Sequence, residues 1–332
     1  MDRVNLGVLG AGRIGRLHAE NIIRHFPEAN LYGVADPFIN HSWLEKWDIR
    51  NYHPDVTTLL SDSNLDAVLI CTPSDTHTNL IEHALKKNLH IFCEKPVSLY
   101  IEDNKKIGEL LKEYPHLVFQ VGFNRRFDPG ILELKSKIEA GDIGDIYLVK
   151  ITSRDPGLPS RNYLEQSGGM FLDMTIHDFD MAQYLTSSKI TKVFAKGSAL
   201  VEPELYEIND IDTAIVQIEF ESGVLGVINN SREACYGYDQ QVEVFGSKGV
   251  LVANNVLEHS LQYRGKEGTT LAKPQNFFLE RYQHSYINEL RSFIDSIKNN
   301  TPSVVGLEEA TGAVLIAYKA QESLGSTCAV EI

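Results

Sequence analysis

An aspartate and a histidine four residues apart, Asp173 and His177, are the side chains of this chain best suited to acid–base chemistry. At about 100° per residue they share one stripe of a predicted helix, residues 169–185, with Asp180 and Tyr184. The rest of this helix is largely apolar, which is typical of a buried helix. Buried carboxylates and imidazoles are rare unless they are paired or functional. An aspartate that holds one ring nitrogen leaves the other able to accept a proton, so the pair is a candidate general base.

Two other interpretations of this segment stay open. A structural hydrogen-bonded pair inside a core is the first, because structural networks also hold titratable groups. A metal site with His177 and either Asp173 or Asp180 as ligands is the second. It needs a third protein ligand, and the sequence contains no HExxH or paired CxxC spacing to supply one. We therefore predict no metal site.

A glycine-rich turn near the amino terminus has the spacing of a dinucleotide-binding fingerprint. The apolar run Val4–Leu9 enters Gly10-Ala11-Gly12-Arg13-Ile14-Gly15, and a helical pattern follows. Strand, G-x-G-x-x-G and helix form the context that lets backbone N–H groups approach a pyrophosphate. A second predicted strand, residues 31–35, ends in Asp36, whose carboxylate would bind the adenosine ribose and repel a 2′-phosphate. The sequence predicts NAD as cofactor; a structural glycine turn in an unrelated α/β fold is the alternative.

Strands and helices alternate through the first 122 residues, which predicts right-handed βαβ units and a parallel sheet. In such sheets ligands bind beyond the carboxyl ends of the strands. The candidate cofactor-binding residues are therefore Gly10, Gly12, Arg13, Ile14 and Gly15 of the turn, Asp36, and, after the later strands, Thr72, Pro73, His77, Glu94 and Lys95. An ammonium there could stabilise the alkoxide that forms as hydride leaves a substrate. Most lysines lie on the surface, but the flanking Glu94 and Pro96 favour an active-site lysine at position 95.

The pattern changes after Gly122 to that of an α+β domain. Strand-like runs are predicted at residues 146–152, 193–200, 213–220, 224–230, 241–245 and 250–253, and helices at 131–138, 279–298 and 307–324. Turn signals between the later strands favour an antiparallel sheet. A wide sheet with one face free of helices would suit subunit packing, so we expect a homo-oligomer.

The composition narrows the possible partners and location. The 332 residues suggest about two domains, and 31 Lys plus Arg against 45 Asp plus Glu give a net charge of −14. This charge argues against nucleic acid or an anionic membrane as a partner. Without a long apolar run or a signal-peptide pattern, we expect a cytoplasmic protein. The four cysteines have neither metal spacing nor a disulfide pattern.

Over essentially its whole length, the chain resembles the glucose-fructose oxidoreductase, inositol dehydrogenase and rhizopine-catabolism (Gfo/Idh/MocA) family of NAD(P)-dependent enzymes. The motifs that carry the resemblance are the glycine turn, Thr72-Pro73 with His77, Glu94-Lys95-Pro96, and Gly168-Gly169 followed by Asp173 and His177. Within the family, the segments Ser153-Arg154-Asp155-Pro156 and 167–180 are similar to those of inositol 2-dehydrogenases. Arg13 in the glycine turn and Asn124 depart from the family pattern.

The resemblance implies an α/β fold with two domains. Residues 1–122 would form an NAD-binding Rossmann domain with a parallel sheet. Residues 123–332 would form an α+β domain with a large, mainly antiparallel, open-faced sheet for substrate binding and oligomerisation, a tetramer being favoured. The catalytic residues would be Lys95, Asp173 and His177. Substrate hydroxyls would contact these three and also Arg125, Asp155, Asp180, and Tyr236 or Tyr238.

The expected reaction is NAD-dependent oxidation of a cyclic polyol, myo-inositol, to its 2-ketone. Three rival functions remain: a dehydrogenase for another inositol isomer or an aldose, a redox-neutral NAD-assisted glycosidase or epimerase, and a silent NAD-binding regulator. The presence of Lys95, Asp173 and His177 together argues against the last of these.

Overall fold

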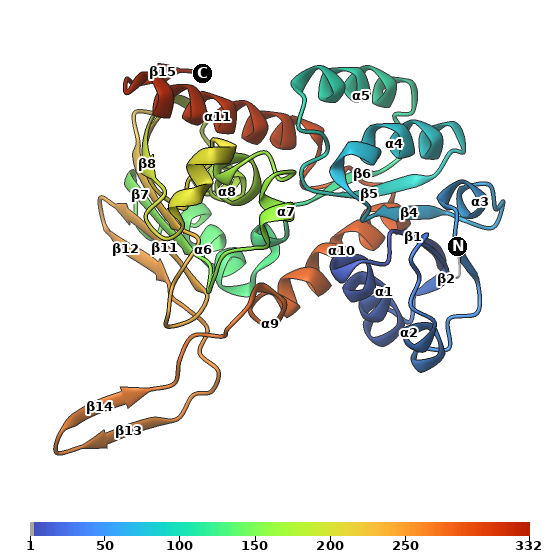
Figure 1. The fold of residues 1–332 in the computed structure, drawn as a ribbon, viewed down its shortest axis with the longest axis horizontal. Coiled ribbons are helices and arrows are strands. Elements are labelled where there is room, and N and C mark those ends of the chain that lie inside the picture. Colours follow the sequence, from blue (N-terminus) through green and yellow to red (C-terminus); the bar gives the residue numbers. More distant parts are fainter. Residues whose placement is uncertain (1–2) are drawn as a thin grey trace. The chain divides into compact units, whose positions relative to one another are not determined.

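The computed structural model describes residues 3–332, and the chain divides into two compact units (Figure 1). The first unit comprises Met1–Asn124 and Ser285–Gly312, and the second comprises Arg125–His284 and Ala313–Ile332. The first boundary thus lies two residues after the predicted one. Within the described chain, none of the helices combines the length and apolar character needed to cross a bilayer.

The first unit is built on a six-stranded sheet in the order β3-β2-β1-β4-β5-β6, in which all neighbours are parallel. This arrangement confirms the predicted parallel Rossmann sheet. Its strands are β1 (Val4–Leu9), β2 (Ala29–Ala35), β3 (Tyr52–His53), β4 (Ala67–Ile70), β5 (His90–Glu94) and β6 (Phe119–Gly122). β4 is fully buried, as expected for a strand covered on both faces. The two-residue β3 has no counterpart among the predicted strands.

Helices that join the strands cover this sheet. They are α1 (Arg13–His25), α2 (His41–Lys46), α3 (Val56–Leu60), α4 (His77–Lys86) and α5 (Ile101–Glu113), with a 3₁₀ turn η1 (Ser74–Thr76) before α4.

A helix from far along the chain completes the core of the first unit. Helix α10 (Gln283–Asn299) buries Leu290, Phe293, Ile294 and Ile297 in the same cluster as the side chains of β1. Their i, i+3, i+4, i+7 spacing forms one apolar stripe. Residues 285–312 therefore pack with the first unit, whereas the sequence pattern had placed everything after residue 122 in the second domain. Periodicity predicts an apolar stripe but does not specify the core against which it packs.

The second unit contains a seven-stranded sheet in the order β12-β11-β7-β10-β9-β8-β15. Only the β7–β10 pair is parallel, so the prediction of a mainly antiparallel sheet is confirmed. The strands are β7 (Ile146–Arg154), β8 (Ile190–Ser198), β9 (Thr213–Phe220), β10 (Leu225–Ser231), β11 (Asp239–Gly246), β12 (Gly249–Ala253) and β15 (Val330–Glu331). Strand β9 alternates buried and exposed positions, which is typical of a sheet covered on one face.

Most helices of this unit are short. They are η2 (Asn124–Phe127), α6 (Pro129–Glu139), α7 (Arg161–Leu164), η3 (Phe171–Thr175), α8 (Ile176–Thr186), η4 (Pro203–Ile208) and α9 (Phe278–Arg281). The longer α11 (Leu307–Ser326) begins in the first unit and belongs to the second from Ala313 onwards. The single helix predicted at 279–298 is interrupted at Tyr282, between α9 and α10. A hairpin that the sequence did not predict, β13 (Gln262–Gly265) and β14 (Gly268–Leu271), projects from its unit with every residue exposed (Figure 1).

Candidate active site

Two glycines of the amino-terminal turn are required by close backbone contacts. Gly10 has a φ of +90°, and a Cβ there would lie 2.7 Å from the carbonyl oxygen of Cys71. A Cβ on Gly15 would lie 1.8 Å from the carbonyl oxygen of Gly10. Any side chain at either position would push α1 away from the strands β1 and β4. The turn therefore holds the start of α1 against the carboxyl ends of β1 and β4.

The amino terminus of α1 fits the pyrophosphate of a dinucleotide. Gly12 is its N-cap and makes no side-chain capping bond, and a Cβ at Gly12 would meet nothing within 4 Å. The first turn contains no acidic residue and begins at Arg13. Backbone N–H groups at a helix amino terminus bind anions, and the helix dipole adds to this attraction. The space at Gly12 thus suits the group that the fingerprint predicts.

Asp36 lies directly after β2 and is fixed above the glycine turn. Its Oδ2 accepts a hydrogen bond of 2.6 Å from the backbone N of Ala11, and its Oδ1 accepts one of 2.7 Å from the backbone N of Phe38. These bonds hold the carboxylate at the strand end where an adenosine ribose binds in this kind of sheet.

We expect Asp36→Asn to weaken NAD binding by roughly tenfold and to relax the discrimination against NADP, because the amide loses the charge that repels a 2′-phosphate. The amide oxygen can still accept the bond from Ala11. Dissociation constants for NAD and NADP, measured by fluorescence titration, test this. An unchanged ratio of the two constants would contradict the role of Asp36.

His77 braces two strand-end loops. It is 1% exposed, with Nε2 2.9 Å from the carbonyl oxygen of Thr72 and Nδ1 3.0 Å from that of Pro96. Burial lowers the pKa of His77, which favours the neutral ring. A neutral imidazole donates from one nitrogen at a time, so one of these contacts is a hydrogen bond at any moment. Both ring nitrogens of His77, a candidate cofactor-binding residue, thus face backbone oxygens of the protein itself.

Glu94 and Lys95 occupy the end of β5. The Oε1 of Glu94 lies 2.8 Å from Nε2 of His18 on α1, a partner that the sequence did not predict. Lys95 is the next residue, and its peptide bond to Pro96 is cis. Glu94 therefore contacts α1, whereas His77 contacts the loops that follow β4 and β5.

In the second unit, a turn of π-helix carries Asp173. Residues 171–175 form η3, and α8 starts at Ile176, so the predicted helix 169–185 is not a uniform α-helix. Inserted π turns are frequent at functional sites. His177 is the second residue of α8 and is half-buried.

Two residues hold the carboxylate of Asp173 from opposite oxygens. Its Oδ1 accepts a 2.7 Å hydrogen bond from the hydroxyl of Tyr163, and its Oδ2 lies 3.1 Å from Nη1 of Arg232. Arg232 is fully buried, and its Nη2 lies 3.7 Å from Asp210. Burial, and next the charge of Asp173, raises the pKa of Tyr163, so this phenol acts as a neutral donor. The sequence reasoning missed Tyr163 and Arg232, which belong to no recognised motif.

The consecutive arginines 125 and 126 each bind an aspartate of α8. Nη1 of Arg125 donates to Oδ1 of Asp178 at 2.6 Å, and Arg126 binds both oxygens of Asp180 at 2.8 and 2.6 Å. Asp178 and Asp180 are 0% and 2% exposed. Such buried ion pairs fix the position of a helix, because removal of one partner leaves a buried charge unpaired. Any substrate hydroxyl that bound Asp180 would share the carboxylate with Arg126.

Further polar groups surround the Arg125–Asp178 pair. Arg125 also donates to the hydroxyl of Ser153 at 3.0 Å, and Asn230 donates to Asp178 at 2.7 Å. The hydroxyl of Tyr238, which is 5% exposed, lies 3.5 Å from Arg125. Arg125 and Tyr238, both predicted substrate ligands, are therefore brought together in one network.

Tyr236 differs from Tyr238 in its exposure. It is 40% exposed, donates to Asp239 at 2.5 Å and accepts from Arg154 at 2.8 Å. Of the two predicted tyrosines, Tyr236 is the more accessible to a small molecule in the second unit, and Tyr238 supports Arg125.

Comparison with known proteins assigns the chain to a family. Residues 4–123 match the model of an oxidoreductase family with an NAD-binding Rossmann fold, and residues 131–252 match the GFO/IDH/MocA C-terminal domain. A myo-inositol 2-dehydrogenase of Thermotoga maritima is 43% identical over 99% of this chain and 98% of its own length. The chain belongs to the GFO/IDH/MocA family. The resemblance predicted from the motifs is thereby confirmed.

Other relatives and solved structures agree with this assignment. A scyllo-inositol 2-dehydrogenase (NAD(+)) of Bacillus subtilis is 34% identical over 99% of this chain and 96% of its own. The crystal structure of a probable dehydrogenase from Thermotoga maritima matches with a TM-score of 0.96 and 43% identity, covering 99% and 98% of the two chains. That of a scyllo-inositol dehydrogenase from Lactobacillus casei with bound NAD(H) and scyllo-inositol matches with a TM-score of 0.92 and 29% identity, covering 99% of each chain. This GFO/IDH/MocA protein is an NAD-dependent oxidoreductase that acts on CH–OH groups.

In this family member, Asp155 lies just after β7 among charged neighbours. Burial, opposed by the charges of Arg125 and Arg232, raises the pKa of Asp155 from 3.8 to about 6. Near neutral pH the carboxylate is ionised, although its burial makes the negative charge unfavourable. A hydroxyl donor would relieve this cost, which suits a polyol ligand.

We expect Asp155→Asn to stabilise the protein at neutral pH. Because the folded-state pKa lies above the unfolded value, the wild-type protein loses stability as pH rises from about 4 to 6. The difference in melting temperature between the variant and the wild type should increase over this pH range and stay constant above it. Melting curves from pH 4 to 8 measure this gain. A gain of equal size at every pH would show that Asp155 is not the titrating group.

Proposed function

We propose that the protein oxidises a ring CH–OH of a cyclic polyol with NAD, and that its substrate is myo-inositol, converted to 2-keto-myo-inositol. The observation that carries this proposal is the full-length identity of 43% to a protein named myo-inositol 2-dehydrogenase. The acid–base residues Lys95, Asp173 and His177 are all present, which disfavours a silent regulator.

His177 serves as the general base in this proposal. It takes the proton of the substrate hydroxyl, while Asp173 orients the imidazole and stabilises its charge. Tyr163 and Arg232, which bind the two oxygens of Asp173, support this residue in turn. Lys95 donates a hydrogen bond to the reacting oxygen and stabilises its developing negative charge. NAD supplies the hydride acceptor when it is bound.

The remaining polar residues suit a neutral substrate that carries several hydroxyls. Asp155 offers acceptor oxygens, Arg125 offers donors, and Tyr236 can donate and accept. The net charge of −14 disfavours an anionic substrate. We propose Asp155, Arg125 and Tyr236 as hydroxyl-binding residues, with Asp180 and Tyr238 as their supports.

Scyllo-inositol is the second candidate substrate, because relatives named scyllo-inositol dehydrogenases match along the whole chain. Oxidation of either isomer gives the same 2-ketone, so the product does not distinguish them. Initial rates of NADH formation at 340 nm with myo-inositol, scyllo-inositol, D-chiro-inositol and glucose make the distinction. The proposal expects the highest kcat/KM with myo-inositol. A preference for scyllo-inositol would contradict the proposed substrate and leave the proposed reaction standing. Inactivity with every polyol would contradict the proposed substrate and the proposed reaction.

We propose that the protein is a cytoplasmic homo-oligomer, with a tetramer as the favoured state. In support, the sheet of the second unit exposes large apolar side chains on neighbouring strands, namely Tyr147, Phe245, Val250 and Val252. Contiguous exposed apolar surface is typical of a subunit interface. Light scattering coupled to gel filtration gives the mass in solution, and a monomer at micromolar concentration would contradict the oligomer.

A further inference from the structure

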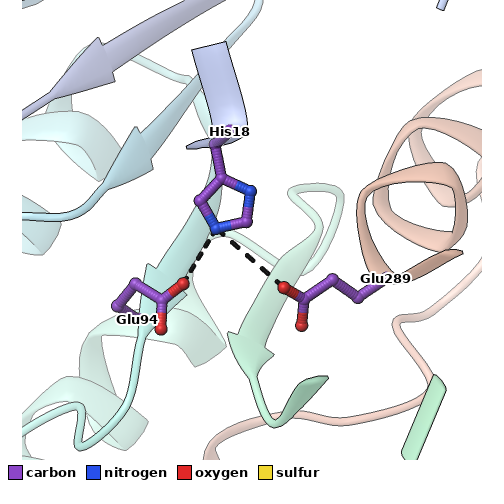
Figure 2. A group of neighbouring side chains, drawn as sticks. All are labelled: His18, Glu94 and Glu289. Atoms are coloured by element: carbon purple, nitrogen blue, oxygen red, sulfur yellow. Dashed lines mark hydrogen bonds and ion pairs between the residues drawn. The ribbon is translucent and has the colours of Figure 1, made fainter. Parts of the chain in front are cut away.

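Three titratable side chains meet in the interior of the first unit. His18 comes from α1, Glu94 from the end of β5 and Glu289 from α10, and Figure 2 shows both carboxyl groups directed at the same ring nitrogen of His18. Nε2 of His18 lies 2.8 Å from Oε1 of Glu94 and 3.9 Å from Oε1 of Glu289. The cluster therefore links three elements that are remote in sequence.

Glu289 is the unusual member of the cluster. Its side chain is 0% exposed, and among the described residues neither carboxyl oxygen has a hydrogen-bond partner. An ionised carboxylate in such a place would be very costly, because burial removes its hydration and nothing replaces it. A carboxylic acid that keeps its proton avoids most of this cost.

Among the described residues, the recorded neighbours of Glu289 include no lysine or arginine. The carboxyl group faces His18 on α1, Cys71 after β4 and Glu94 on β5. Gln120 on β6 donates to the backbone oxygen of Glu289, and the ring of Tyr286 on α10 packs against that of His18. Burial, and then the charge of Glu94, raises the pKa of Glu289 well above its usual range. Burial and the neighbouring carboxylates raise the pKa of the Cys71 thiol as well. Burial and the charge of Glu94 thus both favour the neutral form of Glu289.

In contrast to Glu289, the carboxyl group of Glu94 has a hydrogen-bond partner. Its Oε1 contacts His18, and it lies against the backbone of β6, where a Cβ on Gly122 would approach its Oε2 to 2.9 Å. The imidazole can donate to only one carboxylate through Nε2, and the 2.8 Å contact identifies Glu94 as the acceptor. The residue that follows Glu94 in the chain is Lys95.

We propose that Glu289 is a proton-bearing, neutral acid that completes a His18–Glu94–Glu289 cluster, and that this cluster positions the end of β5 and hence Lys95. Glu289 and His18 are then positioning residues that act through Glu94. The effect on turnover rests on the role of Lys95 in the proposed function, whereas the protonation of Glu289 does not.

The pH dependence of unfolding tests the protonation. A carboxyl whose folded-state pKa is raised binds more protons in the folded state, so its contribution to stability is lost as pH rises above about 4.5. Glu289→Gln carries a neutral amide of the same shape and removes this loss. From pH 5 upwards, the unfolding constant of the wild type relative to Glu289→Gln should rise about tenfold per pH unit until the folded acid ionises. Glu113→Gln, an exposed change on α5, is the control and should follow the wild type.

Turnover tests the positioning. Glu289→Leu removes the polar group, and we expect kcat to fall about tenfold or more with little change in KM for NAD. Glu289→Gln should recover most of this loss. Parallel pH profiles of stability for wild type and Glu289→Gln would overturn the neutral acid. A divalent metal ion bound in a one-to-one ratio to the purified wild type, and absent from Glu289→Gln, would also overturn it, because the cluster would then be a cation site. Normal kcat in Glu289→Leu would overturn the positioning role and leave the protonation result standing.

Discussion

Replacement of His177 by alanine is expected to lower kcat for polyol oxidation by about a thousandfold, within the range that general base catalysis contributes. The loss arises because no group remains to take the hydroxyl proton as the C–H bond breaks. Affinity for NAD should change by less than about threefold, because His177 acts on the substrate proton and not on the cofactor.

Steady-state kinetics combined with NAD binding by fluorescence titration measure these two effects separately. His259→Ala is a matched control, since His259 lies in an exposed segment of the same unit. Equal kcat in the wild type and the His177 variant would remove His177 from the mechanism. A parallel loss of NAD affinity would instead point to a general disturbance of the protein.

The second large effect is expected for Lys95→Met, which keeps most of the side-chain length and removes the ammonium. Loss of a donor that stabilises a developing oxyanion costs about a hundredfold to a thousandfold in kcat. We expect a loss of this size for polyol oxidation, while NAD still binds.

The matched control is Lys105→Met, because Lys105 is a surface lysine of the first unit that pairs with Glu102. Partial recovery of Lys95→Ala by added ethylamine would further support the role of the ammonium group. Turnover of Lys95→Met within a factor of three of the wild type would show that another group stabilises the oxygen.

Much of the fold could be predicted from local pattern. The alternation of apolar strands and amphipathic helices gave the parallel sheet of the first unit, and the turn signals after residue 220 gave the antiparallel strands of the second. The glycine turn and Asp36 were also recognisable, because their function depends on a short, fixed spacing in the chain.

What the sequence did not show are contacts between distant residues. Helix α10 has an apolar stripe that any core could bury, and only the folded chain shows that it packs with β1. The partners of Arg125 and Arg126 lie about fifty residues away, and several acidic residues were equally suitable by type. Tyr163 and Arg232 were missed for the same reason, since each meets Asp173 only in the fold.

Local irregularities of the helices could not be predicted from the hydrophobic pattern either. The π turn that carries Asp173 retains helical periodicity on either side, so a stripe calculated at 100° per residue predicted the correct segment with a uniform geometry. The same stripe grouped Asp180 with Asp173 and His177, although in the folded chain its carboxylate binds Arg126.

The central claim is that hydride leaves carbon 2 of myo-inositol for NAD, and isotope transfer tests it most directly. Purified protein would be incubated with NAD and myo-inositol deuterated at carbon 2, and the reduced cofactor would be analysed by mass spectrometry. We expect reduced cofactor that is one mass unit heavier than NADH and that forms about a thousandfold more slowly with the His177→Ala variant. Reduced cofactor without deuterium would contradict oxidation at carbon 2, and the absence of any reduced cofactor would contradict the proposed reaction.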